Sequence, residues 1–388
     1  MNSPDHLLIQ AHQVICHSTD QDGPAQVAVR MGTIDRVESQ VLDMPVPHLE
    51  FHDAILLPGL IDLHAHPACQ GSVWGVAPDE HMLPFGVTTV MSQGDGGADN
   101  WQDYQDHTIE ASRTRVLMAM NPSKIAESTQ AGCFESLDDI DIARCIAAIN
   151  SGGDRVRAVS VNTSRACCGN SDPREVLRRG LQIAEETTLP LLYGMRPPED
   201  WAFREQMKLL RPGDIVTYCF RSQPHNIVSA GTVHPAIQEA RQRGILFDVG
   251  HGGASFDFEV ASTAIAEGFL PDTISTDLHV HHLQQREAHT LPKTMSKLRA
   301  AGMEPADIFT AVTTRPAAIL QSSETLGCLR PGAVADLVVL QVSEQPVVFS
   351  DVYGNQREAM EWLPVCTVRQ GEVLHLSETA NVSQRPAD

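Results

Sequence analysis

Two histidines separated by a single residue end an apolar stretch near the start of the chain. The stretch PGLIDL, residues 58–63, runs directly into His64-Ala65-His66. In an extended strand, residues i and i+2 project from the same face, so both imidazoles can reach one cation. Such a pair also occurs by chance in histidine-rich loops. Its position at the end of an apolar strand that begins with Pro-Gly favours a metal site.

The segments around this pair alternate between short apolar strands and longer stretches with helical periodicity. Helical patterns cover Pro173–Thr187 and His234–Arg243. Eight strands separated by helices over roughly 260 residues predict a closed (β/α)8 TIM barrel, whose catalytic groups lie at the carboxyl ends of the strands. A doubly wound open sheet is the competing architecture, but neither a GxGxxG turn nor a P-loop supports it. The expected strands are Leu57–His64, Gly86–Met91, Thr114–Met120, Arg155–Val161, Leu189–Gly194, Asp214–Phe220, Ile245–Val249 and Thr273–Asp277.

Both ends of the chain alternate apolar and polar residues between turns, as half-buried antiparallel strands do. We expect the two ends to pair into a small β-sandwich that flanks the barrel. The chain would then divide into residues 1–56, a barrel at 57–325 and residues 326–388. The polar segment after Thr379 is expected to fray. The alternating stretches are Leu7–Cys16, Ala25–Val37, Ala335–Val342 and Cys366–Leu374.

The charge of the chain excludes several classes of partner. Lys+Arg number 28 and Asp+Glu number 49, so the formal net charge is −21. A surface so acidic repels nucleic acid and anionic membranes, and no apolar run reaches the roughly 18 residues that a membrane span needs. The nine cysteines lack CxxC spacing, and no secretory signal is visible, which favours reduced thiols in a cytoplasmic protein. We therefore expect a small-molecule substrate.

Several long segments resemble the amidohydrolase superfamily, and the resemblance covers nearly the whole chain. PGLIDLHAH, residues 58–66, resembles the first-strand signature of that superfamily, and FGVTTV, residues 85–90, its second strand. GCLRPGAVADLVVL, residues 327–340, resembles the return into its β-sandwich. Within the superfamily, the likeness is greatest to a dihydroorotase-like deacetylase group. It lies in LRPGDIVTYCF, GILFDVGHGGASF, PDTISTDLH and LPKTMSKL, which are residues 210–220, 244–256, 271–279 and 291–298.

This resemblance implies a metal-dependent hydrolase of a C–N bond in an amide, a cyclic amide or an N-acyl group. It places Asp277 at the end of the eighth strand, where the family's aspartate binds the metal and takes the proton of the attacking water. The chemistry is sound, because a divalent cation lowers the pKa of bound water and a carboxylate can relay the proton to the leaving nitrogen. On composition alone, an aspartate after Ser-Thr is more often a helix cap or a turn residue.

Three positions depart from the two-metal members of the superfamily. Those members carry a carboxylated lysine on strand four and one histidine each on strands five and six. Here Ser160, Gly194 and Tyr218 stand at these positions. None of these side chains replaces an imidazole or a carbamate well as a metal ligand.

We therefore expect one zinc ion per chain, bound by His64, His66 and Asp277. Asp95, in the turn GDGG after strand two, is expected as a further ligand. It lies near the position where the related D-aminoacylases place a metal-binding cysteine. A second carboxylate would also bring a divalent ion with two neutral imidazoles closer to charge neutrality. A turn aspartate in a glycine-rich loop is the alternative for this residue.

Five residues are candidates for substrate binding. Neutral phenols can donate to a developing oxyanion or a carboxylate, and an arginine can clamp a carboxylate or form a surface ion pair. A histidine at the end of strand seven would line the pocket, and one two residues after Asp277 would project to the same side. The candidates are Tyr193, Tyr218, Arg165, His251 and His279. His281, His282 and His289 lie in a polar loop and are expected to be solvated.

Two alternatives remain for the function. The first is a mononuclear deaminase or decarboxylase of the same superfamily, although the deaminases usually keep the strand-five histidine that Gly194 replaces here. The second is a catalytically degenerate homologue that acts as a binding or assembly protein. Retention of His64, His66 and Asp277 argues against degeneration. Neither the substrate nor the oligomeric state follows from the sequence, although relatives are commonly dimers or larger.

Overall fold

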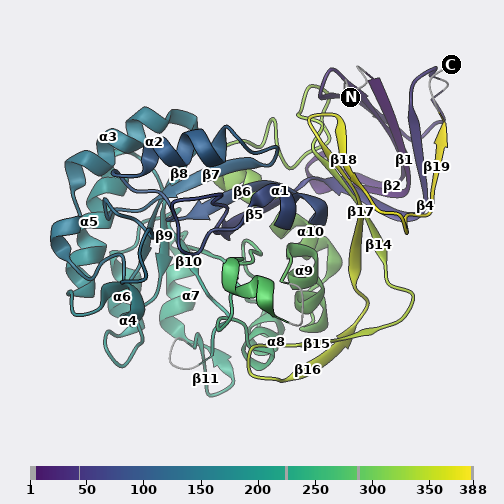
Figure 1. Cartoon of the computed structure of the whole chain (residues 1–388). Coiled ribbons are helices and arrows are strands. Elements are labelled where there is room, and N and C mark those ends of the chain that lie inside the picture. Colours follow the sequence, from purple (N-terminus) through teal and green to yellow (C-terminus); the bar gives the residue numbers. More distant parts are fainter. Residues whose placement is uncertain (1–5, 43, 223–225, 286–288, 386–388) are drawn as a thin grey trace.

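The computed structural model describes residues 6–42, 44–222, 226–285 and 289–385. A curled parallel sheet surrounded by helices occupies one side of the molecule, and a second sheet built from both chain ends occupies the other (Figure 1). We call the first the barrel sheet and the second the terminal sheet. Each has an apolar core of its own.

The barrel sheet has seven parallel strands in the order β13-β10-β9-β8-β7-β6-β5. Its strands are short apolar runs that helices and side chains cover on both faces, as parallel sheets require. Every residue of β6, for example, is buried. The strands are β5 (Leu60–Ala65), β6 (Val87–Gln93), β7 (Arg115–Met120), β8 (Val156–Asn162), β9 (Leu191–Gly194), β10 (Ile215–Thr217) and β13 (Leu246–Phe247).

The predicted eighth strand, Thr273–Asp277, is an irregular segment that still closes the barrel. On one side, the Val249 N–H donates to the Thr273 carbonyl (3.1 Å). On the other side, the Asp277 N–H donates to the His64 carbonyl (2.6 Å). Asp277 has a positive φ of 53°, which bends the backbone and interrupts a regular ladder. The closure places Asp277 directly beside β5.

The predicted first strand, Leu57–His64, is two elements. Strand β4 of the terminal sheet ends at Pro58, and β5 begins at Leu60. Between them, the Gly59 N–H donates to the Asp336 carbonyl of the terminal sheet (2.7 Å). A side chain on Gly59 would collide with Thr88. The chain therefore passes from one sheet to the other at a glycine, where the Thr88 side chain leaves no room for another side chain.

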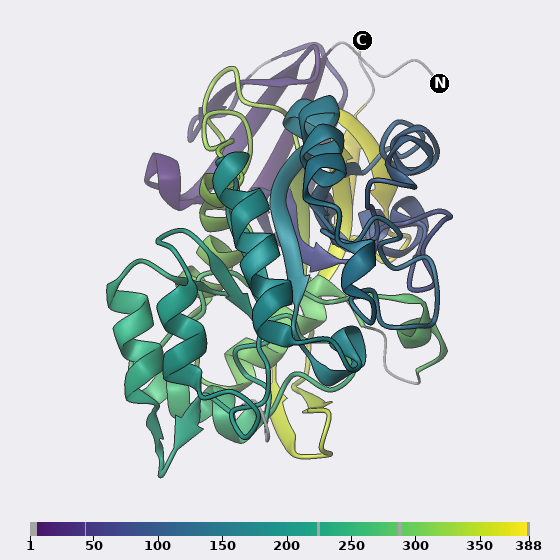
Figure 2. The ribbon, with the colours of Figure 1, turned by 90° about the vertical axis from the view of Figure 1, so that its left-hand side faces the viewer.

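Helices cover the outside of the barrel sheet and lie side by side (Figure 2). The two predicted helices are confirmed as α5 and α7, which both begin with a proline in the first turn. No helix in the described part of the chain is long and apolar enough to cross a bilayer. The helices are α1 (Pro78–His81), α2 (Trp101–Tyr104), α3 (Ile142–Gly152), α4 (Arg165–Cys168), α5 (Pro173–Glu186), α6 (Phe203–Leu209), α7 (Pro235–Gln242), α8 (Phe258–Ala266), α9 (Leu291–Ala300), α10 (Pro305–Val312) and α11 (Thr314–Ile319).

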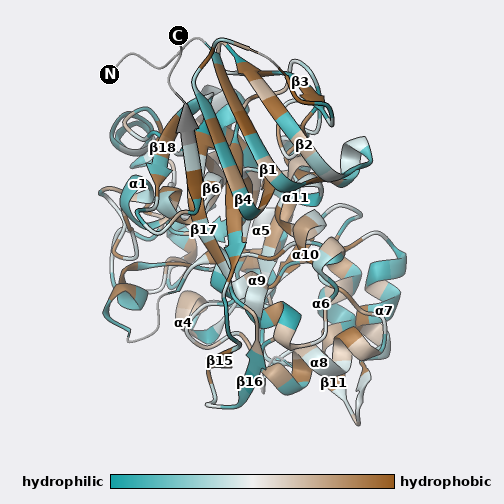
Figure 3. Ribbon diagram, turned by 90° about the vertical axis from the view of Figure 1, so that its right-hand side faces the viewer, coloured by the Kyte–Doolittle hydropathy of each residue, from teal (hydrophilic) through white to brown (hydrophobic). Residues whose placement is uncertain are grey.

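The terminal sheet is one continuous sheet in the order β18-β17-β14-β4-β1-β2-β3, with β19 also paired to β4. β1, β2 and β3 lie in two of the stretches that the sequence predicted as strands, and Figure 3 shows apolar and polar residues along β1 and β2, whereas β4 was not among the predicted stretches. The expected fraying after Thr379 is wrong, because β19 pairs with residues 48–51 of β4. β14 pairs only with residues 54–58 of β4, so this part of β4 is open to β19. The strands are β1 (His6–Cys16), β2 (Gln21–Arg30), β3 (Thr33–Glu38), β4 (His48–Pro58), β14 (Leu337–Val342), β17 (Trp362–Arg369), β18 (Glu372–Leu376) and β19 (Val382–Arg385).

A hairpin between β14 and β17 leaves the terminal sheet and reaches the barrel. It consists of β15 (Val347–Ser350) and β16 (Gln356–Ala359), which lie beside α8 in Figure 1. The Asp351 carboxylate at its turn accepts from the Phe258 N–H at the start of α8 (3.0 Å). The hairpin is therefore fixed to the carboxyl end of the barrel. A second small hairpin, β11 (Val228–Ser229) and β12 (Thr232–Val233), precedes α7.

A buried aspartate links the two sheets. Asp336 is 5% exposed and accepts from Arg115 of β7 (2.6 Å) and from Arg369 of β17 (3.2 Å). Its carboxylate also accepts from the Gln370 N–H (2.9 Å). Removing one partner of a buried ion pair leaves the other charge without compensation.

We predict that Asp336→Asn lowers the free energy of unfolding by about 3 kcal/mol, measured by urea denaturation. Asp154→Asn is the matched control, because the Asp154 side chain is 96% exposed and its ion pair with Arg157 (3.4 Å) lies at the surface. Such exposed pairs contribute little to stability. Equal effects of the two substitutions would contradict the role of Asp336 as the link between the sheets.

Candidate metal centre and active site

His64 of β5, His66 just after it and the aspartate of the closing segment meet at one point. The Asp277 Oδ1 atom lies 3.2 Å from His64 Nε2 and 3.3 Å from His66 Nε2. Zinc–nitrogen and zinc–oxygen bonds of about 2.0–2.1 Å place two ligands of one tetrahedral ion roughly 3.3 Å apart. The distances from Asp277 Oδ1 to the two Nε2 atoms therefore match those between ligands of one tetrahedral ion.

The other nitrogen of His64 is held by a threonine and an aspartate. His64 Nδ1 lies 2.7 Å from the Thr217 hydroxyl at the end of β10. That hydroxyl donates its own proton to Asp248 (2.7 Å), so it must accept from His64. The Nδ1 atom then carries a hydrogen, which leaves Nε2 as the ring nitrogen that can bind a metal ion. A metal-binding imidazole is commonly oriented in this way.

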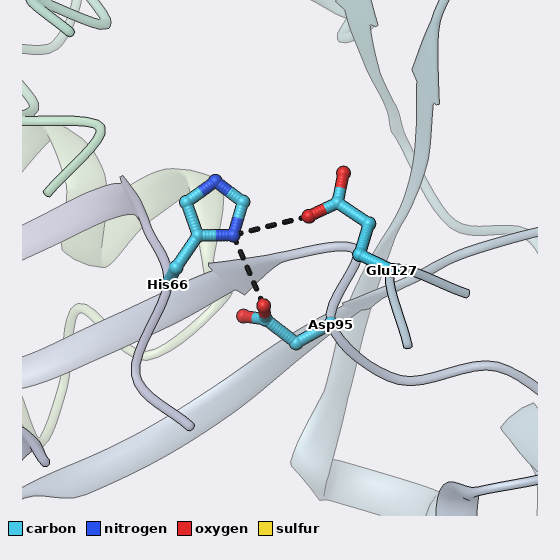
Figure 4. Close-up of side chains that lie close together, drawn as sticks. All are labelled: His66, Asp95 and Glu127. Carbon is cyan, nitrogen blue, oxygen red and sulfur yellow. Dashed lines mark hydrogen bonds and ion pairs between the residues drawn. The ribbon is translucent and has the colours of Figure 1, made fainter. Parts of the chain in front are cut away.

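The other nitrogen of His66 faces two carboxylates. His66 Nδ1 lies 3.0 Å from Asp95 Oδ1 and 3.2 Å from Glu127 Oε2. Figure 4 shows both carboxylates on the same side of the ring. Asp95 also accepts from the hydroxyls of Ser72 and Ser92 (both 2.5 Å). These donors fix the Asp95 carboxylate where it accepts from Nδ1, and Nε2 again points to Asp277.

Glu127 was not anticipated from the sequence. It lies in an irregular stretch after β7, where no periodicity or motif marks it. His66, Asp95 and Glu127 offer donor atoms close enough together to hold an ion of their own. This group uses His66 Nδ1, whereas the group with Asp277 uses Nε2. An imidazole that carries one hydrogen offers a lone pair on only one nitrogen, so the two ligand sets are alternatives.

The carboxylates around the histidines make the centre attractive to cations. Burial alone would lower the pKa of His64, but Asp277 and Asp248 raise it to about 9. The pKa of His66 also lies well above its usual value, because Asp95 and Glu127 outweigh burial. Burial opposes ionisation of Asp277, yet the two imidazoles hold its pKa well below the usual range. The negative charge of the carboxylates that favours protons on the imidazoles also favours a divalent cation. These residues therefore fit a metal ion.

The positions of the usual second-metal ligands are filled differently here. Ser160 accepts from the Gln93 amide (2.9 Å). A Cβ atom on Gly194 would lie 2.8 Å from the Asn162 side chain, so no histidine fits there. Tyr218 has a positive φ of 65°, and its hydroxyl lies 3.3 Å from His64 Nε2. Of these three residues, only Tyr218 reaches the metal-binding atoms.

Two of the candidate substrate-binding residues lie in other surroundings. The hydroxyl of Tyr193 donates to Gln206 (2.7 Å) and accepts from Thr163 (3.0 Å), all in the core. Arg165 is exposed and makes two hydrogen bonds to Asp200 (2.9 and 2.7 Å). Arg165 therefore forms the surface ion pair that was the alternative for this residue. The hydroxyl of Tyr193 is used in hydrogen bonds within the core.

The histidines after strands seven and eight line the same end of the barrel. His251 is buried, and its Nε2 atom lies 3.2 Å from Lys297 Nζ. The His279 ring contacts that of His66 with centroids 6.0 Å apart. The expected solvation of His282 is wrong, because this residue is 2% exposed. His289 is half-buried, and its Nε2–H donates to the Thr276 carbonyl (2.6 Å), whereas His281 is exposed.

Comparison with known proteins identifies the family. The model of the amidohydrolase family matches residues 227–368. The chain is 30% identical over 305 residues to a deacetylase of Agrobacterium fabrum, covering 78% of this chain and 74% of that one. It is also 30% identical over 320 residues to a deacetylase of Enterococcus faecalis, covering 81% and 85%.

Solved structures agree with this assignment. A crystal structure of an adenine deaminase superposes with a TM-score of 0.85 at 27% identity, covering 95% of this chain and 98% of that one. A dihydroorotase gives the same TM-score and identity, covering 96% and 99%. The fold and the site define a metal-dependent hydrolase of C–N bonds on a (β/α)8 barrel. The chain belongs to the amidohydrolase family, which confirms the predicted family, fold class and reaction class.

The buried tyrosines should remain neutral hydrogen-bond donors at high pH. Burial raises the pKa of Tyr104, Tyr193 and Tyr218, and the chain has four tyrosines in all. At about pH 10.5, near the pKa of a free tyrosine, we predict at most one phenolate per folded chain by ultraviolet absorbance. Unfolding at the same pH should ionise the others. More phenolates in protein with an unchanged circular dichroism spectrum would contradict the burial of Tyr218.

Proposed function

We propose that this enzyme hydrolyses an amide or N-acyl bond of a small molecule with one zinc ion bound by His64, His66 and Asp277. The observation that carries the proposal is the convergence of both Nε2 atoms on Asp277 Oδ1, while each Nδ1 atom is held by an acceptor. Two imidazoles and a carboxylate with an open position are typical of catalytic zinc. When bound, the ion supplies a water of lowered pKa and polarises the scissile carbonyl.

The residues of this chain have separate roles in the proposed reaction. The Asp277 carboxylate lies where the two imidazoles converge, so it can accept the proton of the attacking water. It then returns the proton to the leaving nitrogen. Burial keeps the hydroxyl of Tyr218 neutral by raising its pKa. This hydroxyl lies beside His64 and donates to the carbonyl oxygen as negative charge develops there.

Asp95 belongs to this centre by way of His66. The sequence predicts it as a direct ligand, whereas its contact with Nδ1 (3.0 Å) is that of a carboxylate that orients a metal-binding imidazole. We propose the orienting role, which leaves the ion with three protein ligands and an open position. The ligand set of His66, Asp95 and Glu127 is the alternative.

The acyl group we propose is acetyl or another short acyl group. Three relatives at 29–30% identity bear the name deacetylase. We also propose that the enzyme works in the cytoplasm. All nine cysteines are free thiols, as in proteins of reducing compartments.

The proposal is tested with metal-depleted protein, zinc and a panel of N-acetyl amides. We predict that one equivalent of zinc restores hydrolysis, and that Asp277→Asn lowers kcat by about 10²- to 10⁴-fold through loss of the proton relay. Asp53→Asn, at an exposed position on β4, is the matched control and should retain the wild-type kcat. Full activity of the metal-depleted protein, or of Asp277→Asn, would contradict the proposed function.

A further inference from the structure

The loop after β7 packs against α4, the short helix that follows β8. The Phe134 N–H donates to the Cys167 carbonyl (2.9 Å), and the Ser171 hydroxyl, just after α4, donates to the Glu135 carbonyl (3.0 Å). A side chain on Gly132 would collide with the backbone of α4. The loop and the helix are therefore held in direct backbone contact.

Each of these segments carries a cysteine at the contact. Cys133 lies in the loop and Cys167 in α4. Both are free thiols, and their side chains form a hydrogen bond. The backbone hydrogen bond joins the peptide group between Cys133 and Phe134 to the carbonyl of Cys167, so the two cysteines occupy adjoining backbone positions. A disulfide requires such closeness, because its Cα atoms lie about 4.4–6.8 Å apart.

The two thiols differ in reactivity. The hydrogen bond from Cys133 lowers the pKa of the Cys167 thiol below its usual value, although partial burial opposes this, and the nearby His66 lowers it further. The same hydrogen bond, together with burial, raises the pKa of Cys133 well above its usual value. Cys133 is 5% exposed, whereas Cys167 is only partly buried. Because the thiolate is the reactive form of cysteine, Cys167 is the nucleophile of the pair.

We propose that Cys133 and Cys167 are a site of reversible oxidation, at which a hydroperoxide converts the two thiols into a disulfide. The Cys167 thiolate attacks one oxygen of the hydroperoxide, so that an S–O bond forms and the O–O bond breaks. The departing oxygen takes a proton and leaves as water or an alcohol, and Cys167 becomes a sulfenic acid.

The second step uses the thiol of Cys133. Its sulfur attacks the sulfur of the sulfenic acid, so that the S–S bond forms and the S–O bond breaks. The hydroxide leaves as water with the proton of Cys133. The two thiols together lose two electrons and two protons, which the hydroperoxide takes up. A small thiol reductant reverses the reaction by thiol–disulfide exchange.

The proposed disulfide lies close to the metal centre. The loop that carries Cys133 also carries Glu127, whose Oε2 atom faces His66 Nδ1 (3.2 Å). Burial is the main cause of the raised pKa of Glu127, and the nearby Cys167 adds to it. Oxidation therefore removes an ionisable thiol beside the centre and ties the loop that holds Glu127 to α4. Disulfides of cytoplasmic proteins are usually transient and redox-sensing, and the inference does not depend on the proposed hydrolase function.

The test treats the reduced full-length protein with one equivalent of hydrogen peroxide, alkylates the remaining thiols and maps the peptides by mass spectrometry. We expect a cross-linked pair of peptides that contain Cys133 and Cys167, lighter by two hydrogens than the reduced pair. Dithiothreitol should restore both thiols. Cys168→Ser is the matched control and should keep the cross-link, because burial raises the pKa of Cys168 to about 12 although it is the next residue along the chain.

Two single variants separate the two chemical steps. Cys133→Ser should stop at the sulfenic acid of Cys167, captured by dimedone, which should form at least about tenfold faster than that of the exposed Cys69. Cys167→Ser should leave Cys133 reduced. A disulfide between Cys167 and Cys168, faster oxidation of Cys69, or persistence of both thiols of the pair would overturn the proposal. The readout does not involve hydrolysis, so a failure of the proposed function would leave it unchanged.

Discussion

The orientation of two imidazole rings is the constraint on which the site depends. His64 and His66 can present lone pairs to one ion only if each Nδ1 atom is occupied by an acceptor. Thr217 and Asp248 do this for His64, and Asp95 does it for His66. These acceptors come from the ends of different strands, so the closed barrel is what brings them together. The hydrogen bond from the Asp277 backbone to His64 completes the closure.

Sequence reasoning was strongest where chemistry and local geometry coincide. His64 and His66 follow from the i, i+2 spacing on a strand, and the resemblance added Asp277. The prediction of a regular eighth strand was wrong. This segment is irregular, because the positive φ of Asp277 interrupts it. Glu127 lies in an irregular stretch and carries no local signal. His282 was expected to be solvated because its loop is polar, yet this loop folds against residues 251–253, far away in the sequence.

The residues at the usual second-metal ligand positions on strands four to six distinguish this centre from a two-metal site. Asn162 fills the space beside Gly194, and Tyr218 brings a hydroxyl where an imidazole would stand. The centre thus combines a ligand set for one ion with a neutral donor beside it. On its other side, the ammonium of Lys297 and the hairpin from the C-terminal part of the chain form a cavity next to Asp277.

The most direct test of this account is the position of the ion in crystals of the zinc-loaded enzyme, located by anomalous scattering at the zinc absorption edge. We predict one zinc peak per chain, about 2.0–2.2 Å from His64 Nε2, His66 Nε2 and an oxygen of Asp277. Asp95 should lie on the opposite side of the His66 ring. A peak between His66 Nδ1, Asp95 and Glu127, with Asp277 outside the coordination sphere, would contradict the account.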